Sequence, residues 1–139
     1  MKIKTVKIKV KTNGANDIID ITEKINDLVK EEHFAEGNVL LFVPGATAGI
    51  STIEFEPGLI KDYPDFMDRI IPKTGVYQHN ETWNDGNGYA HVRATLQGAS
   101  LTVPFINSNL ILGTWQQLIL LEFDNRPRNR EIIVQITGI

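Results

Sequence analysis

Apolar and polar residues alternate with a period of two at the start of the chain, over residues 2–11. This pattern is typical of a β-strand with one face in solvent. A turn signal at Asn13-Gly14 follows, and apolar residues then recur at helical spacing up to Val29. Asp20 is placed to cap this helix, which we expect to cover one face of a sheet.

Two more strands and a long helix are predicted in the middle of the chain. Residues 39–43 form an apolar run fit for a buried strand, and alternation returns over residues 50–56. Between Pro57 and Pro72 apolar residues again recur at helical spacing, with a proline at a tolerated first-turn position. Pro64 lies inside this pattern, so we predict a split or a kink in the helix near that residue.

Short strands dominate the C-terminal part of the chain, where we place them at residues 100–104, 110–112, 114–123 and 131–136. The run from Leu118 to Leu121 is apolar without interruption, so both faces of its strand are expected to be buried and the strand to be central. The turn over residues 124–130 carries three arginines. A solvated hairpin tip is our first interpretation, and a phosphate-binding or subunit-pairing role is the alternative.

Composition narrows the class of protein. The 139 residues fit one domain, 1–139, with 42% hydrophobic and 22% charged residues, which is ordinary for a globular chain. A net charge of -3 argues against a general nucleic-acid binder, although a local basic cluster could still hold a phosphate. The absence of cysteine excludes disulfides and thiol chemistry. No signal-peptide pattern or membrane-length apolar run is present, so we expect a cytoplasmic protein with no membrane partner.

Candidate chemistry is concentrated between Gly75 and Pro104, which hold two of the three histidines. Tyr77 and His79 alternate across Gln78, and we expect them on one side of an extended segment. A helix is predicted from about Tyr89 to Gln97, with Asn87 as its cap and His91 in its first turn. The free amides at such a helix start favour a phosphate or a carboxylate.

Roles for these side chains follow from their chemistry. Arg93 is expected to bind the same anion with its forked guanidinium, and Asp85 to hold a magnesium ion. His79 and His91 are candidates for metal ligands, for an acid/base pair or for phosphate donors, and the alternative is two ordinary histidines.

The turn Gly45-Ala46-Thr47 offers a second anion-binding candidate, because small residues let the backbone come close to a ligand. Its amides or the Thr47 hydroxyl would face the anion; the alternative is a tight strand connection. Glu54, on the strand that follows, is a carboxylate that either reaches a site or is solvated.

Several of these motifs together resemble the YjbQ family, and the resemblance covers nearly the whole chain. The residues that carry it are Tyr77-Gln78-His79, Asp85-Gly86-Asn87, the run from His91 to Pro104, Gly113-Thr114-Trp115-Gln116 and Glu122-Phe123-Asp124. The resemblance implies an α+β fold with a β-sandwich-like core, two or three covering helices and a compact homotrimer.

The resemblance also implies a chemistry, since members of the family are associated with a secondary thiamine-phosphate synthase activity. That reaction joins a pyrimidine methyl diphosphate to a thiazole phosphate and releases diphosphate. It implies a catalytic set of His79, Asp85, Asn87 and His91, and a substrate-binding set of Thr47, Arg93, Trp115 and Gln116. It implies as well a divalent metal, Mg²⁺ or Zn²⁺, held by His79, His91 and Asp85.

One departure separates this sequence from many family members. They carry a His-Thr-Ser triplet where this chain has Gly45-Ala46-Thr47, so Glu54 or solvent would have to complete a metal site. Two functions follow as hypotheses: an enzyme acting on a small phosphorylated metabolite, or a non-catalytic trimeric protein that binds one. A purely structural role is the third.

Overall fold

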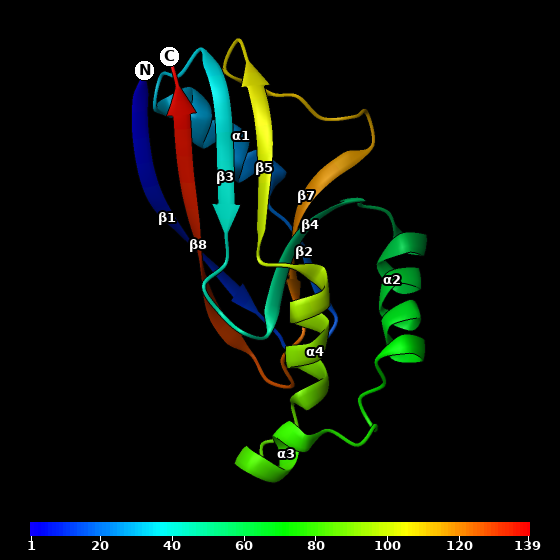
Figure 1. The fold of residues 1–139 in the computed structure, drawn as a ribbon. Helices are drawn as coiled ribbons and strands as arrows, with labels where there is room; N and C mark the ends of the chain where they lie inside the picture. Colours follow the sequence, from blue (N-terminus) through cyan, green and yellow to red (C-terminus); the bar gives the residue numbers. More distant parts are fainter.

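Two antiparallel sheets form the framework of the computed structural model, which describes residues 1–139 (Figure 1). The five-stranded sheet has the order β1-β8-β3-β5-β6 and the three-stranded sheet the order β2-β7-β4. The strands are β1 (Lys2–Thr12), β2 (Asp17–Asp20), β3 (Glu36–Phe42), β4 (Ala48–Glu54), β5 (Ser100–Ile106), β6 (Asn109–Leu110), β7 (Gln116–Glu122) and β8 (Arg128–Gly138). The helices are α1 (Thr22–Glu31), α2 (Pro57–Ile70), α3 (Gln78–Trp83) and α4 (Gly88–Gln97).

Strand β7 separates two hydrophobic cores. Leu118 and Leu120 point into the larger core, which both sheets and helix α1 share. Ile119 and Leu121 point the other way, into a smaller core between the three-stranded sheet and helices α2 and α4. The prediction of a central strand with two buried faces is therefore confirmed, and the α+β class with a sandwich-like core is confirmed with it.

Helices cover the core in the way that their apolar spacing predicts. Ile25 and Val29 of α1 are fully buried in the larger core, and Met67 of α2 and Ala90 of α4 lie in the smaller one. Helix α3 is short, and Figure 1 shows it with α4 at the end of the molecule opposite the two chain termini. No helix is long and apolar enough to cross a membrane.

Three local predictions were wrong. Residues 17–20 form strand β2, because pairing with β7 buries Ile18; no strand was predicted here, only Asp20 as the cap of the next helix. Helix α2 runs through Pro64 without a break, since its packed residues on either side, Tyr63 and Met67, hold the helical path. His79 lies on helix α3 rather than on an extended segment.

The pairing of β4 with β7 fixes how far apart its two ends lie. Ala48 lies opposite Glu122 at one end, and Glu54 lies opposite Gln116 at the other. Six residue steps along a strand place these ends roughly 20 Å apart. Side chains at the two ends therefore belong to different sites.

Candidate functional site

A polar pocket of about 410 Å³ opens at the Ala48–Glu122 end of the β4–β7 pair. The turn before β4, helix α3 with the loop after it, the start of α4 and strand β8 form its walls. Its lining residues are Gly45, Ala46, Thr47, His79, Trp83, Asp85, Asn87, His91, Arg128 and Arg130. The pocket thus brings together all four residues predicted to be catalytic, with Thr47 beside them.

The two histidine rings lie against each other in the wall of the pocket. The ring centroids of His79 on α3 and His91 on α4 are 4.1 Å apart. Burial lowers the pKa of His91, and the neighbouring His79 lowers it further, against the opposing effect of Asp85 and Asp124. His91 is therefore neutral near pH 7 and offers a ring nitrogen as a base or a hydrogen-bond acceptor.

Asn87 fixes the tautomer of His79. It occupies the predicted cap position of α4, but its side chain bonds across the site instead of to the helix backbone. The Asn87 amide nitrogen donates to Asp124 Oδ1 at 3.2 Å, which leaves Asn87 Oδ1 as an acceptor 3.1 Å from His79 Nε2. His79 carries a proton on Nε2 to make this bond.

Asp124 is a fully buried carboxylate at the base of this chain of contacts. Burial alone raises the pKa of Asp124, but hydrogen bonds from Asn87, Arg128 and the Asn125 amide outweigh it and lower the pKa below its ordinary value. Arg128 Nε donates to Asp124 Oδ2 at 2.6 Å, and Asn125 Nδ2 donates to the Asp85 carbonyl at 2.9 Å. This last hydrogen bond joins the turn between β7 and β8 to the loop between α3 and α4.

A second buried ion pair lies beside the first. Arg130 donates from Nε to Glu122 Oε1 at 2.8 Å and from Nη2 to Glu122 Oε2 at 2.5 Å. The same Nη2 donates to the Thr47 hydroxyl at 2.7 Å, and that hydroxyl donates to Asp124 at 3.3 Å. Thr47 therefore positions Arg130, and its hydroxyl proton is already used within the protein.

Gly45 leaves space for Arg130 at the position where the family resemblance implies a histidine. A Cβ atom on Gly45 would lie 2.9 Å from Arg130 Nη1, closer than side chains approach one another. The glycine that replaces the histidine of the triplet thus lies beside Arg130, whose guanidinium occupies the space next to Gly45. Nη1 donates no hydrogen bond to the protein, so it remains available to a ligand.

Arg93 does not face the pocket, contrary to the prediction that it binds phosphate there. Two residues along a helix are separated by roughly 200° of rotation, so Arg93 points away from the His91 side. Its guanidinium is fully buried and donates to the Ile71 carbonyl at 2.7 and 3.0 Å and to Asp68 at 2.7 Å. These contacts give Arg93 a role in packing α2 against α4.

Trp115 and Gln116 also lie elsewhere, at the far end of the β4–β7 pair with Glu54. Gln116 accepts a hydrogen bond from the Gly113 amide and donates one to the Thr52 hydroxyl. The indole of Trp115 is 72% exposed. Trp115, Gln116 and Glu54 all lie roughly 20 Å along the strand from the polar pocket. Glu54 therefore does not complete a metal site in that pocket.

The predicted metal ligands do not form a closed set. The structure contains no group of three or more histidine and carboxylate side chains placed to hold a metal ion. Asp85 Oδ1 lies 3.5 Å from His79 Nε2, as in an ion pair, and this nitrogen already carries the proton shared with Asn87. His79, His91 and Asp85 therefore do not fit a protein-only zinc or magnesium centre.

A phosphate-binding role was the alternative for the arginines of the turn over residues 124–130, but their pairing with Glu122 and Asp124 beside the pocket was missed. A signal for this pairing exists in the sequence, because two acidic residues spaced by two precede a turn and two arginines spaced by two follow it. The turn between β7 and β8 brings Arg130 onto Glu122 and Arg128 onto Asp124, although these two strands belong to different sheets.

The family model described as "UPF0047 protein YjbQ-like" matches residues 6–139. The chain belongs to the YjbQ family. A UPF0047 protein of Archaeoglobus fulgidus is 38% identical over 94% of this chain and 98% of its own length. One of Methanocaldococcus jannaschii is 36% identical over 95% and 93%, respectively.

Solved structures of YjbQ relatives have the same fold. A YjbQ-like protein from Sulfolobus solfataricus, described as of unknown function, superposes with a TM-score of 0.88 at 30% identity, covering 99% of this chain and 100% of its own. A YjbQ/UPF0047 protein from Clostridium acetobutylicum gives 0.86 at 35% identity, covering 95% and 99%. These relatives establish the family and the fold and leave the activity to be inferred from the pocket.

Proposed function

We propose that this YjbQ-family chain is an enzyme that acts on a small phosphorylated metabolite in the polar pocket. One observation carries the proposal: two adjacent histidines and two arginines converge on the same pocket. Histidines supply acid and base groups near neutral pH, and arginines recognise phosphate with their forked N–H donors. Few structural needs would gather these four side chains around an opening.

The arginines are held so that part of each guanidinium is free. Asp124 engages Nε and Nη2 of Arg128, and Glu122 engages the same two nitrogens of Arg130, which leaves Nη1 of each without a partner in the protein. The carboxylates fix the direction in which these donors point. A bound phosphate would therefore meet donors whose orientation is set before it arrives, which is what stabilises developing charge best.

In its sharper form, the proposed reaction is of the thiamine-phosphate synthase type. The bond between the pyrimidine methyl carbon and the diphosphate oxygen breaks, the oxygen keeps the electron pair, and a thiazole nitrogen bonds to the carbon. The leaving diphosphate gains negative charge, which Arg128 and Arg130 would stabilise. Support for this form is the family membership and the cationic donors around the pocket.

A bound divalent ion would neutralise part of the diphosphate charge, as magnesium does where substrate phosphates supply most of its ligands. Asp85 is the exposed carboxylate of the pocket that would contact it. Binding of Mg²⁺ or Zn²⁺ stays a prediction, and the bond changes of the proposed reaction do not require the ion.

A cytoplasmic homotrimer is part of the proposal. Val92 and Leu96, on the outer face of α4, are 46% and 65% exposed and adjoin His91 in one shallow hollow. Apolar surface of this kind next to a site is typical of a subunit contact. A second copy packed there would close the open side of the polar pocket.

The second candidate function is a non-catalytic protein that binds a phosphorylated metabolite. The observation that favours it is Gly45, which leaves its space to Arg130 where the family resemblance implies a histidine. Compared with a pocket that carries a third histidine, this pocket has one acid/base group fewer and an arginine donor in its place.

Turnover decides between the two. The protein is incubated with pyrimidine methyl diphosphate and thiazole phosphate, with and without Mg²⁺, and thiamine phosphate is measured. An enzyme predicts product that falls by about 10²–10⁴-fold in His91→Ala, while Trp115→Ala at the far end of the strand pair stays active. Binding of both substrates without product would establish the second candidate instead.

A further inference from the structure

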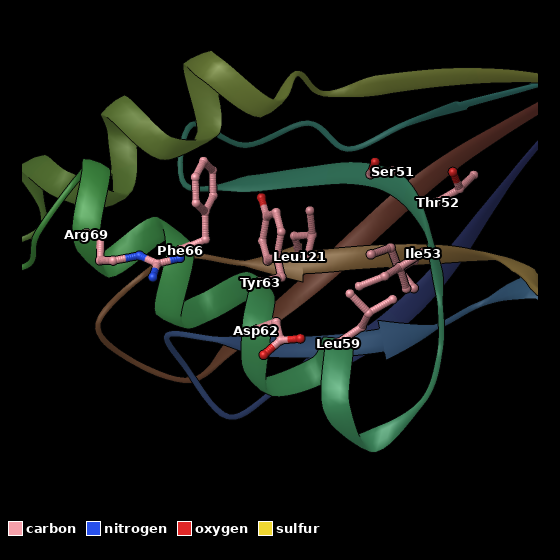
Figure 2. Close-up of a pocket in the computed structure, with 10 residues that line it drawn as sticks. Ser51, Thr52, Ile53, Leu59, Asp62, Tyr63, Phe66, Arg69 and Leu121 are labelled. Atoms are coloured by element: carbon pink, nitrogen blue, oxygen red, sulfur yellow. The ribbon is translucent and has the colours of Figure 1, made fainter.

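A second hollow lies on the opposite side of β4 from the larger core, between β4, β7 and helix α2 (Figure 2). We call it the α2 groove, and its volume is about 360 Å³. It shares no lining residue with the polar pocket. Its lining residues are Ser51, Thr52, Ile53, Leu59, Asp62, Tyr63, Phe66, Arg69, Ile119 and Leu121.

The floor and walls of the α2 groove are apolar. Figure 2 shows Leu59, Tyr63 and Phe66 pointing from α2 toward the strands that carry Ile53 and Leu121. Burial raises the pKa of Tyr63 to about 12, so the phenol is neutral, and it donates to Gln97 Oε1 at 2.7 Å. The ring is thereby held in the wall.

Two opposite charges stand on the helix at the mouth of the groove. Asp62 and Arg69 are seven residues apart, so they share one side of α2 and lie roughly 10 Å from each other along its axis. Figure 2 shows them on different turns. Neither belongs to any ion pair of the structure, and Arg69 only passes 5.9 Å from the Phe66 ring.

We propose that the α2 groove is a second ligand site, for an elongated zwitterion with an apolar body, its cationic end at Asp62 and its anionic end at Arg69. The volume is in the range of small-molecule sites, and apolar lining with a few polar groups is their usual chemistry. The two unpaired charges give the ligand a direction. The site is independent of the polar pocket and of the reaction proposed there.

ω-Aminooctanoate is a suitable probe, because its extended chain separates ammonium from carboxylate by roughly 10 Å. Octanoate and octylammonium are matched probes that each lack one charge. Methyl NMR signals of Ile53, Leu59, Ile119 and Leu121 report binding, and those of Val92 and Leu96 on α4 serve as the reference. We expect the groove methyls alone to shift, with ω-aminooctanoate binding most tightly.

Charge variants test the direction of the ligand. Arg69→Gln should weaken ω-aminooctanoate and octanoate by up to about fivefold and leave octylammonium unchanged. Asp62→Asn should do the reverse, weakening the two probes that carry an ammonium. Lys61→Gln removes an exposed charge on the same helix outside the groove and should change none of the three.

A filling variant tests the groove itself. Ser51→Phe places a ring in the hollow and should abolish the shifts, while Ser100→Phe, on the exposed face of β5, should not. The proposal is overturned if the groove methyls do not respond to millimolar probe, or if both charge variants affect all probes equally. It is also overturned if Ser51→Phe changes the association state of the protein without changing probe binding, since a second copy would then cover the groove.

Discussion

The two ends of the β4–β7 pair carry similar residue types and put them to different uses. At one end Thr47, Glu122 and Arg130 are buried in one hydrogen-bond network. At the other, Thr52 and Gln116 make a single hydrogen bond in solvent, beside an exposed Trp115. The residue types of a strand therefore do not by themselves identify a binding site. A site is indicated where polar side chains are buried, hydrogen-bonded to one another, and still hold some N–H donors toward an opening.

The largest difference between the two ends should appear when Arg130 is removed. Arg130→Ala leaves Glu122 as a buried, unpaired carboxylate, and breaking such a pair costs about 3–5 kcal/mol. Gln116→Ala at the exposed end should change the free energy of unfolding by less than about 0.5 kcal/mol. Urea denaturation measures both. Equal, small effects would mean that the Glu122–Arg130 pair is not buried in solution.

Threonine to valine changes sharpen the comparison further. Thr47→Val deprives Arg130 of an acceptor and Asp124 of a donor, and should cost about 1–2 kcal/mol in urea denaturation. Thr52→Val breaks only the exposed bond from Gln116 and should cost less than about 0.5 kcal/mol. A larger loss of stability in Thr52→Val than in Thr47→Val would contradict the buried hydrogen-bond network around Thr47.

The next largest effect should come from crowding Arg130. Gly45→His brings a Cβ to 2.9 Å from Arg130 Nη1, so the guanidinium must shift and weaken its hydrogen bonds to Thr47 and Glu122, which should cost about 1 kcal/mol. Gly113→His is the control, because a Cβ there meets nothing closer than 3.6 Å. A Gly45→His protein as stable as wild type would show that Arg130 moves aside freely.

The smallest effect should be a dependence of stability on pH. Because the folded protein lowers the pKa of His91 below its unfolded value of about 6.5, the unfolded chain binds more protons there in mild acid. The free energy of unfolding should therefore fall as pH decreases from about 6.5 through the folded pKa. His91→Gln should flatten this slope, measured by denaturation between pH 8 and pH 5.

His33→Asn provides the control for that slope. His33 lies outside both pockets with a left-handed backbone, which asparagine tolerates. It should leave the pH dependence as in wild type. If His33→Asn flattens the slope instead, the signal does not come from the pocket.

Much of the fold was predictable because apolar spacing records which faces are buried. The double burial of Leu118 to Leu121 and the helix start after Asn87 both follow from local pattern. Strand β2 and the path of α2 through Pro64 were not predictable in this way, since pairing with β7 and packing against the smaller core decide them.

The site was predictable only in part, for a related reason. His79, Asp85, Asn87 and His91 are close in sequence and meet through one short loop. Arg93 is as close, but helical rotation turns it into the protein. Arg128 and Arg130 reach the pocket from β8, more than thirty-five residues after the histidine segment, where the turn that follows β7 pairs them with Asp124 and Glu122.

The central claim is that the polar pocket binds a phosphorylated ligand, and thermal unfolding with diphosphate tests it most directly. Wild type, His91→Ala and Trp115→Ala are heated with and without diphosphate, each with Mg²⁺, Zn²⁺ or chelator. Diphosphate at about a hundred times its Kd should stabilise wild type and Trp115→Ala by about 2.7 kcal/mol, and His91→Ala by clearly less. Identical curves for all three proteins in every condition would contradict the assignment of this pocket as the functional site.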